Sequence, residues 1–114
     1  MYARVATFED VDISRAKDVE SAIRERALPR IKELSGWSGS ITLVDREQRR
    51  VVTIGFFQTK EDIEAAEPTY EQIPSLLPDD LRQIVAGTRR SVDVYEVGLQ
   101  EGIQLYEQTA AAVH

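Results

Sequence analysis

The segment SGSITLVDREQRRVVTIGFFQ, residues 38–58, predicts a β-hairpin. Strand-forming residues fill its two ends, 38–45 and 51–58, and the polar run DREQRR separates them. A polar link this short joins neighbouring antiparallel strands. We therefore expect two adjacent strands in the middle of the chain, and the rest of the fold can be placed around them.

Two further runs of strand-forming residues flank the hairpin. YARVATF, residues 2–8, and TRRSVDVYEV, residues 88–97, each predict a strand. Apolar residues recur every three or four positions over about residues 14–34, and this spacing predicts a helix with one apolar face. Gly36 follows at the position where a left-handed glycine often ends a helix.

Prolines interrupt both helical regions of the sequence. Pro29 lies inside the first region, where its missing N–H should kink the helix or split it into two pieces. Residues 60–85 predict a second helical region. We expect Pro68, Pro74 and Pro78 to break this second region into short pieces.

The predicted elements follow the order βαββαβ. An antiparallel sheet with helices on one face is the natural packing for such a unit. The sequence therefore predicts an α+β, ferredoxin-like fold with a four-stranded antiparallel sheet. We expect residues 1–114 to form a single domain, with residues 98–114 as a candidate C-terminal arm.

Apolar side chains occupy both faces of the predicted sheet. In the third strand the faces alternate, with Val52, Ile54 and Phe56 on one and Val51, Thr53, Gly55 and Phe57 on the other. Two helices can cover only one face, and an uncovered apolar face implies a partner. The simplest partner is a second copy packed sheet to sheet, which predicts a homodimer with Val94 as a candidate contact.

The charge distribution argues against nucleic acid as a partner. Residues 60–82 carry seven acidic side chains against Lys60 and Arg82, and the whole chain has a formal net charge of -6. An acidic face repels phosphate groups. We therefore expect no nucleic-acid binding.

Cysteine, histidine and long apolar runs are scarce in this chain. It has no cysteine, and its one histidine is His114, so few residues could form a metal site. No apolar run approaches the ~18 residues of a membrane span, and residues 1–12 lack a signal-peptide pattern. We expect a cytoplasmic protein with no bound metal or cofactor and no membrane contact.

Four segments of the sequence resemble one group of bacterial proteins. They are MYARVATF, LPRIKELSGWSG, LVDRE and FFQTKEDIEAAE, and the βαββαβ order extends the likeness to Val97. The chain is similar to the antibiotic-biosynthesis-monooxygenase-like (ABM-like) proteins of the dimeric α/β-barrel superfamily. The resemblance implies that two subunits form a dimeric α/β barrel through their sheets. It also implies a pocket between the sheet and the helices.

The same resemblance has implications for chemistry. The family's oxygenases act on polycyclic quinol or anthrone-like substrates without metal or flavin. Their polar amide in the third strand falls at Thr53, and their tryptophan at the end of that strand falls at Phe57. Their helix tyrosine falls near Ile63, and a pocket arginine falls near Leu77. Smaller or apolar residues therefore replace the family's polar set in this sequence.

The candidate ligand pocket consists of six residues: Arg4, Trp37, Thr53, Gly55, Phe57 and Tyr70. Gly55 lies between Thr53 and Phe57 on one face, where its missing side chain leaves room above the sheet. Phe57 would then form the wall of a small pocket with Gly55 as its floor. Alternatively, Gly55 accommodates a bulky neighbour such as Trp37, or marks a bulge.

The other candidates each have a structural alternative. Trp37 either packs in the core or stacks on a flat ligand. Arg4 lies in mid-strand, so its charge must be paired or reach solvent. It either anchors an anionic or phenolate oxygen or forms an ion pair, with Asp93 and Glu96 as possible partners. Tyr70 either belongs to a lid over the pocket or covers the edge of the core.

Two functions remain open from the sequence alone. The first is a small homodimer that binds a small aromatic or apolar molecule between sheet and helices, with cofactor-independent monooxygenation of quinol or anthrone-like substrates as its candidate activity. The second is a non-catalytic dimeric interaction or regulatory protein of the same fold. Without internal histidine or cysteine, acid–base catalysis has few candidate groups. Cofactor-free oxygenation tolerates this because the substrate supplies the electrons.

Overall fold

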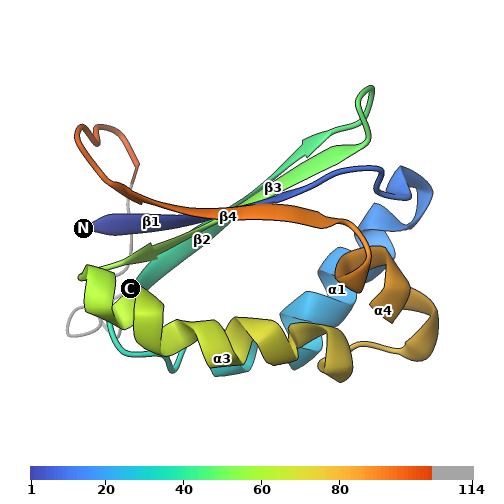
Figure 1. Cartoon of the computed structure of the whole chain (residues 1–114), viewed down its shortest axis with the longest axis horizontal. Coiled ribbons are helices and arrows are strands. Elements are labelled where there is room, and N and C mark those ends of the chain that lie inside the picture. The colour runs from blue at the N-terminus through green and yellow to red at the C-terminus, as the bar shows by residue number, and fades with distance from the viewer. Residues whose placement is uncertain (104–114) are drawn as a thin grey trace.

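The computed structural model describes residues 1–103, and Figure 1 shows the arrangement of its elements. In chain order they are β1 (Tyr2–Phe8), the short 3-10 helix η1 (Ile13–Arg15), α1 (Ala16–Arg26), α2 (Leu28–Ile31), β2 (Trp37–Asp45), β3 (Arg50–Phe57), α3 (Lys60–Leu76), α4 (Asp79–Ala86) and β4 (Arg89–Glu96). The four predicted strands and the hairpin are confirmed. Of the predicted C-terminal arm, residues 104–114 lie outside the described part of the chain.

The strands form one antiparallel sheet in the order β2-β3-β1-β4. Helices α1 and α3 lie along one face of this sheet, which we call the helix-side face (Figure 1). The opposite surface, the outer face, carries no helix of the described chain. This is the α+β, ferredoxin-like fold that the sequence predicts.

The pairing register assigns each strand residue to a face. Directly paired residues of neighbouring strands point to the same side of the sheet, so Arg4 shares its face with Gly55 and Val94. Arg4 contacts Glu67 of α3, which makes this the helix-side face. Val94, the candidate dimer contact, therefore lies on the helix-side face, and its neighbour Tyr95 lies on the outer face.

Helix α3 runs without a break through Pro68 and Pro74. The prediction that these two prolines break it is wrong. Each proline removes one backbone hydrogen bond, but the helix starts at a capping box made by Thr59 and Asp62, and its apolar side packs on the core. Pro68 is exposed, so the carbonyl group that loses its partner can turn towards water. The chain leaves the helical conformation only at Leu77.

The first helical region does split in two, as predicted. Helix α1 ends before Ala27, and Pro29 lies in the first turn of α2. In a first turn the missing N–H costs no helical hydrogen bond. Gly36 then adopts the predicted left-handed conformation, with φ of 75°. A Cβ atom at Gly36 would collide with the carboxylate of Asp62, so glycine is required where this turn meets the start of α3.

Trp37 belongs to the hydrophobic core. It is 7% exposed and lies in a buried cluster that joins β2, β3, α2 and α3. The members of this cluster are Ala27, Ile31, Trp37, Phe57, Ile63 and Ala66. The burial of Trp37 therefore favours the core interpretation over a ligand wall.

A β-bulge follows Trp37. The pairing of β2 with β3 shifts between Trp37 and Gly39, so Ser38 is an extra residue in β2. The buried Ser38 hydroxyl accepts a hydrogen bond from Nε2 of Gln58 at 2.7 Å. Gly55 lies in regular pairing with both neighbouring strands, so it does not mark a bulge.

The outer face is apolar and lacks a covering element within residues 1–103. Its larger apolar side chains are Val5, Ile41, Leu43, Val52, Ile54, Phe56 and Tyr95. Two of them, Leu43 and Tyr95, are 51% and 56% exposed. In the same described part of the chain, no helix is long and apolar enough to cross a membrane.

Candidate functional site

A long cavity lies between the helix-side face and the helices. It consists of two adjoining parts, with volumes of about 460 Å³ and about 450 Å³. Ile23, Leu28, Thr53 and Val85 line both parts, which makes the two continuous. Each part falls within the range of about 300–1,000 Å³ that is typical of small-molecule sites.

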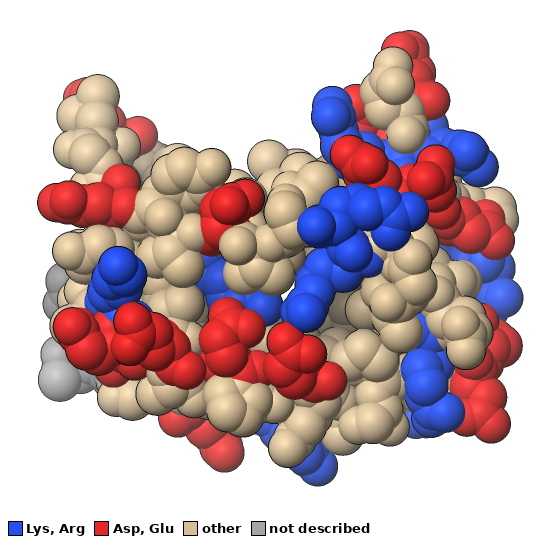
Figure 2. Space-filling view, in the orientation of Figure 1, with Lys and Arg blue, Asp and Glu red and all other residues tan. Residues whose placement is uncertain are grey.

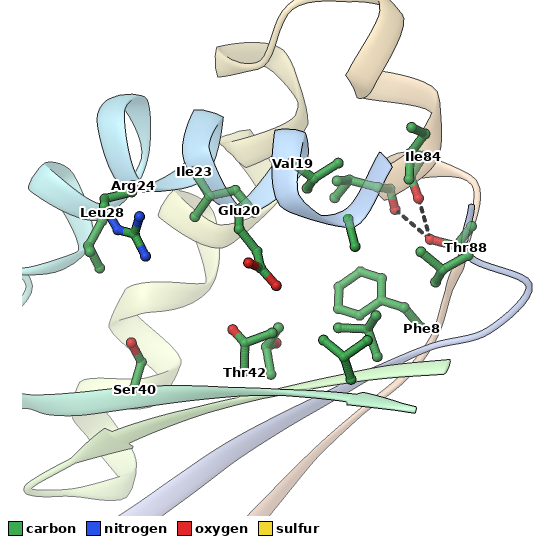
Figure 3. A pocket seen from close by; sticks show the side chains of 16 residues that line it. Phe8, Val19, Glu20, Ile23, Arg24, Leu28, Ser40, Thr42, Ile84 and Thr88 are labelled. Carbon is green, nitrogen blue, oxygen red and sulfur yellow. Dashed lines mark hydrogen bonds between the residues drawn. The ribbon is translucent and has the colours of Figure 1, made fainter. Parts of the chain in front are cut away.

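Different polar side chains line the two parts of the cavity. We call the larger part the arginine end, because Arg4 and Tyr70 line it, and the smaller part the threonine end, because Thr88 lines it. Figure 3 shows the threonine end, where Ile23 and Leu28 point from the helices towards the sheet and Phe8 lies at its far side. The walls shared by the two parts are mostly apolar.

Small residues on the sheet create this space. Ala6, Ser40, Thr53 and Gly55 all lie on the helix-side face and line the cavity, where larger side chains would fill the gap to the helices. Figure 3 shows Ser40 pointing from β2 towards the helix layer. The cavity therefore follows from the residue sizes in β1, β2 and β3.

Arg4 is buried at the arginine end and paired with a carboxylate. Its side chain lies on β1 and donates two hydrogen bonds to Glu67 of α3, from Nε to Oε1 at 2.5 Å and from Nη2 to Oε2 at 3.3 Å. The predicted partners Asp93 and Glu96 are wrong. Asp93 pairs with Val5 and so points to the outer face, and Glu96 lies further along β4, whereas α3 passes directly over Arg4.

Tyr70 stacks on this ion pair. The Arg4 guanidinium carbon lies 3.9 Å from the centre of the Tyr70 ring, and the edge of Phe57 meets that ring at 71° with centroids 6.4 Å apart. Because α3 is continuous through this region, Tyr70 is not part of a lid made by broken helix pieces. We call Arg4, Glu67 and Tyr70 the cavity triad.

The Tyr70 hydroxyl lies over Gly55. A Cβ atom at Gly55 would be 2.8 Å from this oxygen, so the room above Gly55 is occupied by Tyr70 and not by Trp37. Burial raises the pKa of Tyr70 to about 12, with Glu67 adding to the rise and Arg4 opposing it. The phenol is therefore protonated at neutral pH and can donate a hydrogen bond.

The structure brings together four of the six predicted pocket residues. Arg4, Thr53, Gly55 and Tyr70 line the arginine end. The other two, Trp37 and Phe57, lie in the core cluster and are 7% and 0% exposed. Phe57 touches the site only through its edge contact with Tyr70.

Sequence reasoning missed Glu67 and the cavity rim. Glu67 precedes Tyr70 by one helical turn, so the two share a side of α3, and this spacing was the available signal. Glu20 and Arg24 of α1 line the threonine end, and Figure 3 shows Glu20 pointing into it above Thr42. These polar residues have no regular spacing with the strand residues opposite them.

Charged side chains near the arginine end are balanced. Glu71 and Arg89 both line this end and form an ion pair, with Nη2 and Oε1 3.1 Å apart. Figure 2 shows acidic side chains gathered along α3 with basic side chains beside them. Among residues 1–103, no three carboxylate, histidine or cysteine side chains converge in a way that could hold a metal ion.

Comparison with known proteins identifies the fold. No family model matches the sequence, and no curated protein matches it. A provisionally named antibiotic biosynthesis monooxygenase of Bordetella bronchiseptica superposes with a TM-score of 0.64 at 16% identity, over 86% of this chain and 97% of that one. A second protein with the same provisional name, from Nitrosomonas europaea, gives 0.56 at 17% identity, over 82% and 86%. The chain has the ABM-like fold.

A third similar structure is described by its assembly. It is a dimeric ferredoxin-like protein from an uncultured marine organism, with a TM-score of 0.58 at 11% identity, over 90% of this chain and 91% of that one. At 11% to 17% identity these three likenesses concern the fold. The chemistry of this chain must be argued from its own cavity.

Within this ABM-like fold, the cavity triad comes from β1 and α3. Two positions to which the resemblance assigns family pocket residues, Ile63 and Leu77, are buried at 1% and 2% exposure and do not line the cavity. Arg4 and Tyr70 line the arginine end instead, with Glu67 behind them as the partner of Arg4.

Proposed function

We propose that this protein is a homodimer that binds one small, largely apolar aromatic molecule in the cavity of each subunit. The observation that carries this proposal is the cavity itself. It has a ligand-sized volume, apolar walls and a compact polar cluster at one end. This combination is typical of small-molecule sites, in which a few polar groups orient a mostly apolar ligand.

The outer face supports the dimeric part of the proposal. Its apolar side chains need a cover, and a second copy of the same face supplies one through a two-fold axis. The related fold described as dimeric agrees with this arrangement. In such a dimer the two cavities lie on the helix sides of the sheets, away from the contact.

Oxygenation is the second candidate function, and the names of two structural neighbours favour it. An anthrone would react with O₂ to give the anthraquinone and water, with its CH₂ carbon oxidised to a carbonyl and O₂ as the oxidant. The protein's part would be to bind, orient and desolvate the substrate. Oxygen uptake with a panel of quinols and anthrones tests this activity, and uptake no faster than in buffer rejects it.

The binding proposal is tested by mapping a ligand on the protein. Flat aromatic ketones and quinones are titrated into isotope-labelled protein, and backbone amide chemical shifts are followed. We expect saturable shifts at Thr53, Gly55 and Tyr70, with much smaller shifts at Leu43 and Tyr95 on the outer face. Shifts confined to the outer face, or no saturable shifts, would contradict the proposal and favour a non-catalytic interaction protein.

A further inference from the structure

The Tyr70 side chain is fixed by contacts with two residues, Arg4 and Phe57. The guanidinium of Arg4 covers its ring, the edge of Phe57 meets it, and Glu67 holds Arg4 in place through two hydrogen bonds. Cation–π and aromatic edge contacts of this kind restrict a ring without engaging its hydroxyl. The direction of the Tyr70 hydroxyl is therefore set before any ligand arrives.

The hydroxyl itself is left for the cavity. It lies over Gly55, whose missing side chain gives the oxygen its space. No residue of the described range 1–103 accepts a hydrogen bond from it or donates one to it. Tyr70 lines the cavity, so a ligand oxygen that enters can accept a hydrogen bond from this phenol.

The charges around the hydroxyl cancel. Arg4 is matched by Glu67, and Arg89 is matched by Glu71. An anionic ligand would lose its hydration on entering the cavity and would meet no excess positive charge in return. An uncharged oxygen needs no such compensation and can accept a hydrogen bond from the phenol.

We propose that Tyr70 donates a hydrogen bond to an uncharged acceptor oxygen of the ligand, such as an aryl ketone carbonyl, and that the cavity selects neutral ligands over anionic analogues. The apolar body of the ligand then lies along Ile23, Leu28 and Val85 towards the threonine end. This inference rests on the proposed function, since it names the ligand class of the same cavity.

Three naphthalene probes of the same shape test the inference. Acetylnaphthalene carries a neutral carbonyl, ethylnaphthalene has the same outline without oxygen, and naphthoate is the anion, each substituted at the same ring position. Their dissociation constants are measured by calorimetry for the wild-type protein, for Tyr70→Phe and for Tyr2→Phe. Tyr2 packs beside the core cluster and does not line the cavity, so it controls for the loss of a tyrosine hydroxyl.

We expect Tyr70→Phe to weaken acetylnaphthalene binding by about 3- to 10-fold, as for one neutral hydrogen bond. Ethylnaphthalene binding should change less than about 2-fold, and Tyr2→Phe should change neither. Naphthoate should bind the wild-type protein at least about 10-fold more weakly than acetylnaphthalene.

Two kinds of result would overturn the inference. If Tyr70→Phe changes acetylnaphthalene and ethylnaphthalene binding by the same factor, or changes neither, Tyr70 does not contact the carbonyl, while the cavity still binds ligands. If naphthoate binds as tightly as acetylnaphthalene, Arg4 acts as an anion anchor instead. If no probe binds saturably, the proposed function fails together with the inference. The melting temperature of each variant shows whether it is folded.

Discussion

Arg4 can lie inside this protein because two groups compensate for its burial. The carboxylate of Glu67 neutralises its charge, and the ring of Tyr70 covers the flat side of the guanidinium. The side chain of Arg4 is 4% exposed, while that of Glu67 is 36% exposed. The buried guanidinium therefore needs the carboxylate to neutralise its charge, whereas the partly exposed carboxylate can be hydrated by water.

Removing the carboxylate should lower the free energy of unfolding more than removing the cation does. Glu67→Gln leaves a buried guanidinium without its counter-charge, and we expect it to lower the free energy of unfolding by about 2 kcal/mol. Arg4→Met leaves only a carboxylate that can turn to water, and should cost less than about 1 kcal/mol. Urea unfolding of both variants measures the two losses of unfolding free energy and shows which is larger. Glu64→Gln, on the exposed side of the same helix, is the control and should cause little change. A larger loss in Arg4→Met than in Glu67→Gln would contradict this account.

The buried phenol gives stability a dependence on pH at the alkaline end. Burial raises the pKa of Tyr70 from 10.0 to about 12, so the folded protein holds this proton more tightly than the unfolded chain does. The free energy of unfolding is insensitive to this group below about pH 10 and falls as the pH rises from about 10 towards 12. Urea unfolding at about pH 8 and about pH 11 should show a greater loss in the wild-type protein than in Tyr70→Phe. Equal losses would mean that Tyr70 titrates alike in both states.

Single residues were the hardest part to predict from sequence. Arg4 and Gly55 attract attention because a charge in mid-strand and a missing side chain are unusual. Their direct pairing across β1 and β3, and the place of Tyr70 above them, depend on register and on the path of α3. Glu67 looked like one more acidic residue on a solvated helix side, because its partner lies 63 positions away.

At the scale of elements, the prolines show where local rules hold. Pro29 splits the first helical region, because it lies where α2 begins. Pro68 and Pro74 do not split α3, because packing on the sheet and a capping box outweigh the loss of single hydrogen bonds. The strands were predictable from the alternation and composition of their residues, because this signal is local to each strand.

The interior position of Pro68 predicts a stabilising substitution. Pro68→Ala restores a helical hydrogen bond in α3 and should raise the free energy of unfolding by about 1–3 kcal/mol. Pro29→Ala is the matched control and should gain less than about 0.5 kcal/mol, because a proline in a first turn interrupts no hydrogen bond. Thermal and urea unfolding of the two variants provide the comparison. Equal gains would show that the proline in α3 costs no more than one at a helix start.

At the scale of the whole molecule, the two faces of the sheet differ in the residues that they carry. The helix-side face carries the small residues that leave a cavity, and the outer face carries the apolar residues that need a partner. The sequence predicts that both faces are apolar and sorts the residues of the third strand into two sets, but it does not predict which set lies beneath the helices. That assignment requires the register and the side on which the helices lie.

The outer face predicts which substitution breaks the dimer. Leu43→Asp places a charge on that face, at a residue that is 51% exposed in the single chain, so the subunit should stay folded and become monomeric. Val94→Asp makes the same change at a residue that is 41% exposed on the opposite face, and it should remain dimeric. Analytical ultracentrifugation measures the oligomeric state of both variants. A dimeric Leu43→Asp variant, or a monomeric Val94→Asp variant, would contradict this assignment.

The most direct test of the whole account is the stoichiometry of ligand binding. Acetylnaphthalene is titrated into the wild-type protein and into Thr53→Phe, which fills the cavity where its two parts meet. We predict saturable binding of one ligand per chain in the wild-type protein, and binding at least about 10-fold weaker in the variant. One ligand per two chains, or equal binding by both proteins, would place the ligand outside this cavity and contradict the account.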